Sequence, residues 1–259
     1  MRLAVSRDGK TLGAPVIVHT PEKFSDGMVL FEKMAIGLIR TNVSYKVKAV
    51  AGGIAGPLDK KKTKLVRASN LSNWVGKPLA QELKKMLKAP VYLENDAALA
   101  GLGEATFGAG RGHKIVAYLT ISTGVGGARI VDGKIDANAF GFEPGKQIIG
   151  QHGTTLEDYI SGNSLQRRFH MAPKDIKDKK VWNEVACWLA VGLQNTAVYW
   201  SPEVIVLGGS IMKNISLAQV KSQLKKTLIN FPQLPEIKKA ELGDFGGLWG
   251  ALHFVNRGT

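Results

Sequence analysis

The sequence predicts an α/β protein with mixed sheets, built as two lobes with a cleft between them. Short apolar runs alternate with segments of helical periodicity along the chain, which is typical of sheets covered by helices. Three of the predicted strands end in glycine-rich loops, and none of these loops has the G-x-G-x-x-G spacing of a dinucleotide site. Glycine loops at several strand ends favour a cleft that holds a nucleotide on one lobe and a substrate on the other.

The small lobe is expected to comprise residues 1–104, completed by a C-terminal helix over 246–259. Asp8 and Gly9 form a turn between two short strands, and helical periodicity follows. In order, the expected elements are strands at 3–5 and 16–19, a helix at 24–39, a buried strand at 47–50 that opens into a glycine-rich loop at 51–57, a helix at 78–87, a strand at 91–93 and a helix at 97–106.

The large lobe is expected over residues 105–245. Its expected elements are strands at 115–120 and 128–131, a turn at Asp132-Gly133, a loop-rich region at 136–153, helices at 156–160 and 180–200, and a buried strand from Pro202 that opens into a third glycine loop at 208–210. Cys187 lies in the pattern of the second helix among apolar residues, and we expect it to pack in the core.

Two segments of this pattern carry the chemistry. Asp96 follows a strand directly and starts a helix, where a carboxylate can cap the helix, act as a base, or do both. Residues 119–127 form a β-run that breaks into a Thr/Gly turn. Glycine lets the main chain approach a polyphosphate closely, and Ser122 and Thr123 add hydroxyl donors. The turn lacks P-loop spacing, and the alternative is an ordinary glycine-rich β-hairpin.

Composition indicates a globular chain without membrane or secretion signals. Its 259 residues with 44% hydrophobic content suffice for one large domain or two smaller ones. No apolar run has the length of a membrane span, and the N-terminus has no signal-peptide h-region, so a cytoplasmic location is expected. A single cysteine excludes disulfides and multi-cysteine zinc sites within one chain.

The net charge of +14 raises the question of nucleic-acid binding. The lysines are dispersed, with the densest clusters at 60–64, in an expected hairpin tip, and at 174–180. No helix-turn-helix, zinc-finger or aromatic-basic pattern accompanies them. We therefore expect a solvated basic surface and no specific nucleic-acid partner.

Taken in order, the motifs resemble those of the ROK family (repressors, open reading frames and sugar kinases), within the hexokinase/actin-like ATPase superfamily and its ribonuclease H-like fold. The resemblance runs from about Arg2 to the final helix. It rests on Gly53-Ile54-Ala55-Gly56-Pro57, Asn70-Leu71 with Trp74, Glu94-Asn95-Asp96-Ala97, Leu119 to Gly127, Leu156-Glu157 with Ser161-Gly162, and Pro202 to Gly209.

The resemblance implies a glucokinase-like enzyme that phosphorylates a hexose with ATP and Mg²⁺. Asp96 corresponds to the general base that accepts a proton from the sugar hydroxyl as this attacks the γ-phosphate. The implied sugar contacts are Asn70, Asn95, Asp96, Glu143, Lys146 and Glu157. The implied nucleotide contacts are Thr123, Gly124, Gly126, Gly127, Gly208 and Gly209. Family members commonly dimerise, so a homodimer is a possible assembly.

Three of the implied sugar contacts also have purely structural readings. Asn70 is a plausible turn residue, Glu143 a solvated glutamate, and Glu157 a carboxylate at a helix start.

The sequence departs from the ROK pattern at the zinc site. Lys146 stands where the family has a histidine after G-E-x-G, and residues 151–155 replace a C-x-C-G-x-x-G-C run. A lone His152 cannot supply the four ligands of structural zinc, so we predict no zinc. Lys146 would replace both a metal ligand and a sugar contact, and it could favour an acidic sugar. Ala98 stands where the family usually has asparagine, with a modest expected effect.

The family also begins with a strand that runs into D-x-G-G-T-K, and the chain is expected to start just after this phosphate loop. For that reason the alternative function is a catalytically impaired ROK pseudokinase or a sugar-binding protein. A transcriptional repressor of the family would need a DNA-binding domain ahead of Arg2. Nucleic-acid binding through the basic surface is the remaining alternative.

Overall fold

The structure is a computed structural model that describes residues 1–259 except 40–45, 69, 230, 232 and 258–259. The last two of these, the end of the predicted C-terminal helix, thus lie outside the described residues. The chain forms two compact units. Unit 1 comprises Met1–Gly103, Ala137–Gly141 and Phe245–Thr259, and unit 2 comprises Glu104–Asp136 and Phe142–Asp244. Within the described ranges, no helix combines the length and apolar character needed to cross a bilayer.

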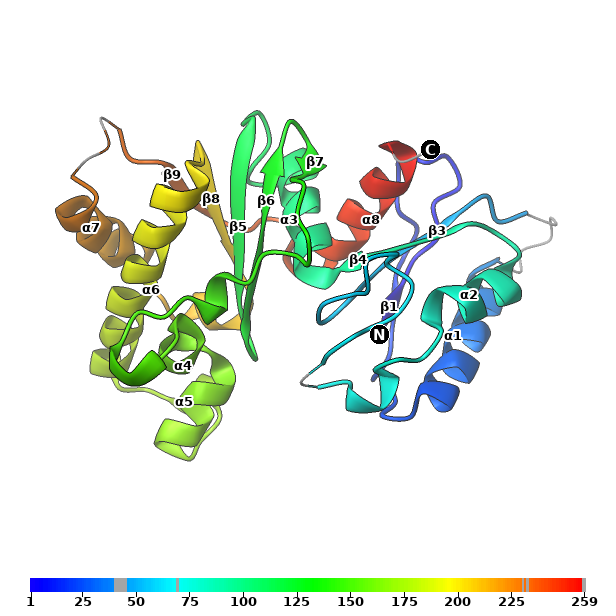
Figure 1. The fold of residues 1–259 in the computed structure, drawn as a ribbon, viewed down its shortest axis with the longest axis horizontal. Coiled ribbons are helices and arrows are strands. Elements are labelled where there is room, and N and C mark those ends of the chain that lie inside the picture. Colours follow the sequence, from blue (N-terminus) through cyan, green and yellow to red (C-terminus); the bar gives the residue numbers. More distant parts are fainter. Residues whose placement is uncertain (40–45, 69, 230, 232, 258–259) are drawn as a thin grey trace. The chain divides into compact units, whose positions relative to one another are not determined.

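Unit 1 contains small sheets and helices packed beside them (Figure 1). Strand β1 (Arg2–Leu3) pairs antiparallel with β2 (Val16–Ile17), as the predicted hairpin requires. Strand β3 (Val50–Ile54) pairs parallel with β4 (Val91–Asn95). The helices are α1 (Phe24–Ile39), α2 (Leu79–Leu87), α8 (Gly246–Arg257) and the first part of α3 (Asp96–Phe107).

The core of unit 1 gathers around Trp74. Its ring lies edge-on to Phe24 with centroids 5.2 Å apart, and its indole N–H donates to the carbonyl oxygen of Pro21 at 3.1 Å. Gly27 of α1 lies so close that a Cβ there would stand 2.3 Å from the ring. The core residues are Met28, Ile54, Leu58, Leu65, Trp74, Leu79, Leu83 and Leu93. Together these contacts hold α1 against the loop that follows β3.

Glycines bring α3 and α8 into backbone contact. A Cβ on Gly250 would lie 1.7 Å from the carbonyl oxygen of Leu99, and one on Gly103 would lie 2.2 Å from that of Gly246. Because no side chain separates the two helices there, α8 supports the part of α3 that begins at Asp96.

Unit 2 is built on a sheet of strand order β7-β6-β5-β8-β9. Its strands are β5 (Ile115–Ile121), β6 (Val125–Val131), β7 (Lys134–Ile135), β8 (Val204–Gly208) and β9 (Glu236–Lys239). Strands β5, β8 and β9 run parallel, whereas β6 and β7 pair antiparallel, so the sheet is mixed as predicted. The helices are α4 (Leu156–Ile160), α5 (Gly162–Phe169), α6 (Lys179–Trp200) and α7 (Leu217–Thr227).

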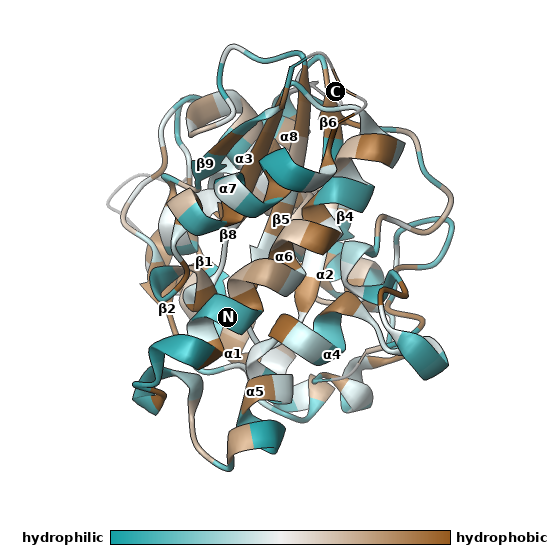
Figure 2. Ribbon diagram, turned by 90° about the vertical axis from the view of Figure 1, so that its left-hand side faces the viewer, coloured by the Kyte–Doolittle hydropathy of each residue, from teal (hydrophilic) through white to brown (hydrophobic). Residues whose placement is uncertain are grey.

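The core of unit 2 lies between this sheet and α4, α6 and α7, which lie along one of its faces (Figure 1). Strand β8 is buried at every position. Strands of the sheet that are visible beyond the helices in Figure 2 are largely brown, the colour of hydrophobic residues. A parallel strand buried on both faces appears in the sequence as a continuous apolar run, which explains why 204–208 is predictable. The buried strands give rigid support to the loops at their carboxyl ends.

One predicted strand is wrong in position. The strand is Val50–Ile54 rather than 47–50, so Gly52 and Gly53 lie within it and not in a loop beyond it. Gly53 pairs with Glu94, and a Cβ on it would lie 2.9 Å from the Cα of Asp96. The glycine is therefore needed because the start of α3 approaches the strand closely.

The expected burial of Cys187 is also wrong, because the residue is exposed. Helix α6 turns Val185, Ala186 and Leu189 towards the core, and Cys187 lies outside that stripe. Helices α5 and α7 and strands β7 and β9 are not among the elements predicted from the sequence.

Candidate functional site

Asp96 begins α3 directly after β4, but it is not the residue that caps this helix. The Oδ1 atom of Asn95 accepts the backbone N–H of Ala98 at 3.1 Å, which is the N-cap arrangement. The Oδ1 atom of Asp96 accepts the N–H of the adjacent Ala97 at 2.9 Å. Asn95, and not Asp96, therefore caps α3.

The carboxylate of Asp96 combines solvent access with partial desolvation. The residue is exposed, yet the surrounding protein displaces enough water to raise its pKa above the usual aspartate value, against the opposing effect of the backbone N–H of Ala97. A carboxylate that substrate can reach and whose basicity is increased by its surroundings can act as a general base.

Asn95, a predicted sugar contact, is held by the backbone around it. Its amide nitrogen donates to the carbonyl oxygen of Gly56 at 3.4 Å, and its oxygen caps α3. Gly56 has φ +118°, and a Cβ there would lie 2.4 Å from the carbonyl oxygen of Arg67. The side chain of Asn95 thus has a structural role in orienting the first turn of α3.

In unit 2, the Thr/Gly turn joins β5 to β6 and is anchored by the start of α5. The N–H of Ser122 donates to the carbonyl oxygen of Gly124 at 2.9 Å. The N–H of Gly162 donates to the carbonyl oxygen of Ser122 at 2.7 Å, and that of Asn163 to the carbonyl oxygen of Thr123 at 3.1 Å. These bonds fix the turn while Thr123 itself remains exposed.

Glu157 links this turn to Lys146. Its Oε2 atom accepts a hydrogen bond from the N–H of Val125 at 2.8 Å, and its Oε1 atom accepts one from the ammonium group of Lys146 at 2.5 Å. A Cβ on Gly124 would lie 2.8 Å from the same Oε2 atom. Thr155 and Asp158 form the capping box of α4, so Glu157 is not the cap of its helix. The structure therefore brings Gly124, Lys146 and Glu157 together.

The loop after β8 lies beside the same turn. Gly209 has φ +95°, and a Cβ on it would lie 2.1 Å from the carbonyl oxygen of Ile121, the last residue of β5. The hydroxyl oxygens of Ser122 and Ser210 are 3.2 Å apart. Hydroxyl groups and glycine loops thus meet at the carboxyl ends of two neighbouring parallel strands, where α/β sheets usually bind ligands.

The other predicted site residues lie as follows. Gly126 and Gly127 are within β6, opposite Thr120 and Leu119, and a Cβ on Gly127 would meet the carbonyl oxygen of Tyr118 at 2.5 Å. They are strand residues rather than turn residues. Gly208 ends β8, and Glu143 is exposed at the start of the 3₁₀ turn that carries Lys146. Asn70 is exposed in the loop before a 3₁₀ turn at Ser72–Trp74.

Two residues of this arrangement, Ser210 and Lys62, are not predicted as site residues from the sequence. Ser210 follows the glycine pair of the third loop directly, and this position beside Gly209 is the signal that could have found it. Lys62 pairs with the buried carboxylate of Glu94, next to Asn95, although its position in a run of lysines indicates a solvated residue. No local signal in the sequence distinguishes it from its neighbours.

Comparison with known families matches residues 32–257 to the ROK family. The chain belongs to the ROK family. A glucokinase of Streptomyces coelicolor is 26% identical over 90% of this chain and 86% of its own length. An N-acetyl-D-glucosamine kinase of Escherichia coli is 30% identical over 73% of this chain and 75% of its own length.

Solved structures of ROK proteins have the same fold. A ROK hexokinase from Thermus thermophilus superposes with a TM-score of 0.84 at 26% identity, over 99% of this chain and 96% of the other. A ROK family glucokinase from Streptomyces griseus, solved with glucose and AMPPNP, superposes with a TM-score of 0.81 at 24% identity, over 99% of this chain and 96% of the other. The predicted actin-like ATPase fold with mixed sheets is confirmed.

At the position of the ROK zinc loop, this chain forms a 3₁₀ turn, Gln151–Gly153, in which His152 is exposed with φ 56°. Among the residues that the structure describes, no three His, Cys, Asp or Glu side chains gather closely enough to hold a metal ion.

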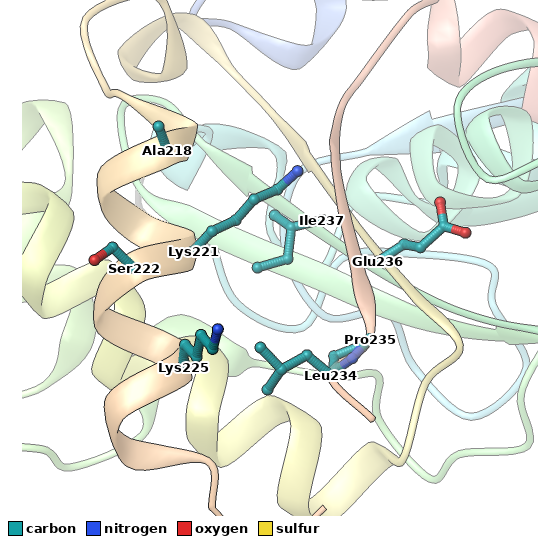
Figure 3. A pocket seen from close by; sticks show the side chains of 8 residues that line it. All are labelled: Ala218, Lys221, Ser222, Lys225, Leu234, Pro235, Glu236 and Ile237. Carbon is teal, nitrogen blue, oxygen red and sulfur yellow. The ribbon is translucent and has the colours of Figure 1, made fainter. Parts of the chain in front are cut away.

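A hollow of about 440 Å³ lies elsewhere in unit 2, between α7 and β9 (Figure 3). Lys221 and Lys225 project over it from the helix, and Leu234 and Ile237 line its apolar side. It contains no residue of the predicted sugar or nucleotide site, so it is not the candidate site of this ROK protein.

Proposed function

We propose that this ROK protein phosphorylates a hexose with ATP and that Asp96 is the general base. The observation that carries the proposal is the separation of roles at the start of α3: Asn95 caps the helix, which leaves the accessible, partly desolvated carboxylate of Asp96 for proton transfer. The kinases among its relatives, which act on glucose and N-acetylglucosamine by name, support the reaction class.

The residues at the ends of β5 and β8 fit a nucleotide. Gly209 has a positive φ that residues with a Cβ rarely adopt. The hydroxyl groups of Ser122, Thr123 and Ser210 can donate hydrogen bonds to phosphate oxygens. We assign the phosphates to the turn at 122–124 and the adenosine to the loop at 208–209. The exposed Thr123 hydroxyl also suits an oxygen-preferring ion such as Mg²⁺, which, when bound, neutralises charge on the transferring phosphoryl group.

The remaining residues orient the sugar and the turn. Glu143, Lys146 and Asn70 are accessible and polar, as sugar hydroxyls require. Glu157 holds the N–H of Val125 with one oxygen and Lys146 with the other, so it couples the sugar-binding side to the phosphate turn. Phosphoryl transfer depends mainly on such positioning.

The test is ADP release from ATP and Mg²⁺ by the purified chain, with a panel of hexoses and N-acetylhexosamines. Asp96→Asn should abolish sugar-dependent turnover. Asp178→Asn is the matched control, because Asp178 is an exposed N-cap of α6, where asparagine caps as well as aspartate. Turnover retained by the Asp96 variant would refute its role as base. Sugar binding without ADP release by the unmodified chain would instead indicate a sugar-binding protein.

A further inference from the structure

Lys62 is set apart from the other lysines of its hairpin by its surroundings. Lys60, Lys61 and Lys64 are exposed, whereas Lys62 is half-buried and its ammonium group contacts the Oε2 atom of Glu94. The side chain of Glu94 is only 8% exposed, against 42% for that of Lys62. One lysine of a basic cluster thus neutralises a buried carboxylate two residues before Asp96.

The hairpin holds Lys62 in a conformation that an ordinary lysine rarely adopts. Its φ is +52°, in the left-handed region. Asp59 fixes the tip, because its Oδ1 atom accepts the N–H of Thr63 at 2.6 Å and that of Lys64 at 3.1 Å. Strain of this kind persists only where the surrounding structure enforces it. In this conformation the Lys62 side chain reaches Glu94.

Glu94 connects this ion pair to the first turn of α3. Its Oε1 atom accepts the N–H of Asn95 at 2.9 Å, while Oε2 accepts Lys62. Asn95 in turn caps α3 through Ala98. A buried carboxylate that loses its cation is left without a compensating charge, and rotation towards water to regain solvation would break its bond to the Asn95 N–H.

We propose that Lys62 is a positioning residue for Asp96: through Glu94 it fixes the backbone of Asn95 and hence the orientation of the base. This inference rests on the proposed kinase function only for its kinetic consequence, because the effect on the backbone of Asn95 is independent of catalysis. Lys62 does not touch the sugar in this arrangement, so its removal lowers kcat and leaves the KM for sugar nearly unchanged.

The experiment compares Lys62→Met, Lys62→Arg and the control Lys61→Met, which changes an exposed lysine of the same tip. Lys62→Met should lower kcat by about 10-fold to 100-fold, since small misplacements of a catalytic group have effects of this size. Lys62→Arg should restore activity to within about 3-fold, because it keeps the charge, and Lys61→Met should match the unmodified chain. A Lys62→Met/Glu94→Gln double variant should recover part of the loss, because no buried charge remains unpaired.

Amide hydrogen exchange of Asn95 and Ala98 provides the readout that needs no turnover. It should be about 10-fold faster in Lys62→Met and unchanged in Lys61→Met and Lys62→Arg. If the unmodified chain releases no ADP, the kinase proposal fails, and faster exchange still supports the positioning role. Exchange in Lys62→Met equal to that in Lys61→Met overturns the inference, and so does an equal kcat for the two variants in an active protein.

Discussion

Replacing Gly209 by alanine tests whether the loop after β8 is built on a glycine-only conformation. Its backbone has φ 95° and ψ 160°, a region that residues with a Cβ essentially do not occupy. The added Cβ would also lie 2.1 Å from the carbonyl oxygen and 2.5 Å from the carbonyl carbon of Ile121. Those atoms end β5, which is paired on both sides, so they cannot move aside without disrupting the sheet.

The two effects give the expected magnitude. A residue forced into this backbone region costs about 1–3 kcal/mol. Overlap with a well-packed element adds about 1–3 kcal/mol. Gly209→Ala should therefore lower the free energy of unfolding by about 4 kcal/mol, a size that single substitutions reach only through defects of this kind. Binding of ATP should weaken in parallel, since the loop at 208–209 is the proposed adenosine contact.

Gly112→Ala is the control that separates the two effects. Gly112 also has positive φ, +87°, but a Cβ there would meet no atom within 4 Å. It should cost about 1–2 kcal/mol, the left-handed penalty alone. The measurement is urea unfolding followed by tryptophan fluorescence, with midpoints compared at equal m values. If Gly209→Ala loses no more stability than Gly112→Ala, the close contact with Ile121 does not constrain the loop.

Two further predictions concern carboxylates. The buried carboxylate of Glu104 accepts hydrogen bonds from the N–H groups of Ala109, Glu241 and Leu242 at 3.0, 3.1 and 2.8 Å. Glu104→Gln turns an amide NH₂ group towards these donors, so it should lower the free energy of unfolding by about 1–3 kcal/mol and speed amide hydrogen exchange at Leu242. Unchanged exchange at Leu242 would contradict this prediction. Because desolvation raises the folded-state pKa of Asp96, its charge opposes folding above that pKa and has no effect below the unfolded value of about 3.9. In urea unfolding near pH 7, Asp96→Asn should therefore be more stable than the unmodified chain. This stability difference should disappear near about pH 3, where the carboxyl is protonated in both states. A stability difference that does not change with pH would contradict the prediction.

The sequence predicts the elements whose signals are local. Helix α1 and helix α4 have their predicted bounds, and β8 appears as a continuous apolar run because both of its faces are buried. Strand β3 is misplaced because the reason for its glycines is not local. Gly53 sits in the strand since α3 comes within 2.9 Å of where its Cβ would be, and α3 begins more than 40 residues later along the chain. Without that contact, a glycine pair simply indicates a loop.

The same distinction applies to the candidate site. The motifs place Asp96 at a strand end and Gly209 in a loop, because strand ends and glycine turns can be recognised from local sequence patterns. The partners of the charged residues cannot be recognised from such patterns. Whether Asp96 or Asn95 caps α3, and which lysine of the 60–64 cluster finds Glu94, is decided by side-chain geometry that appears only in the folded chain. The sequence therefore predicts that a cluster of charged residues lies at the surface, but not which ion pairs its members form.

Lys146 shows how such a contact changes a functional expectation. By itself, a lysine in place of a histidine suggests a pocket suited to an acidic sugar. In the structure its ammonium group contacts Glu157, whose other oxygen accepts the N–H of Val125 beside the proposed phosphate turn. The positive charge is thus largely balanced within the protein, and an acidic sugar would have to compete with Glu157 for it. A neutral hexose needs only hydrogen bonds from the same groups and leaves the bond between Glu157 and the turn intact. If the proposed kinase function holds, we therefore expect a neutral sugar to be preferred to an acidic one, with Lys146 orienting Glu157.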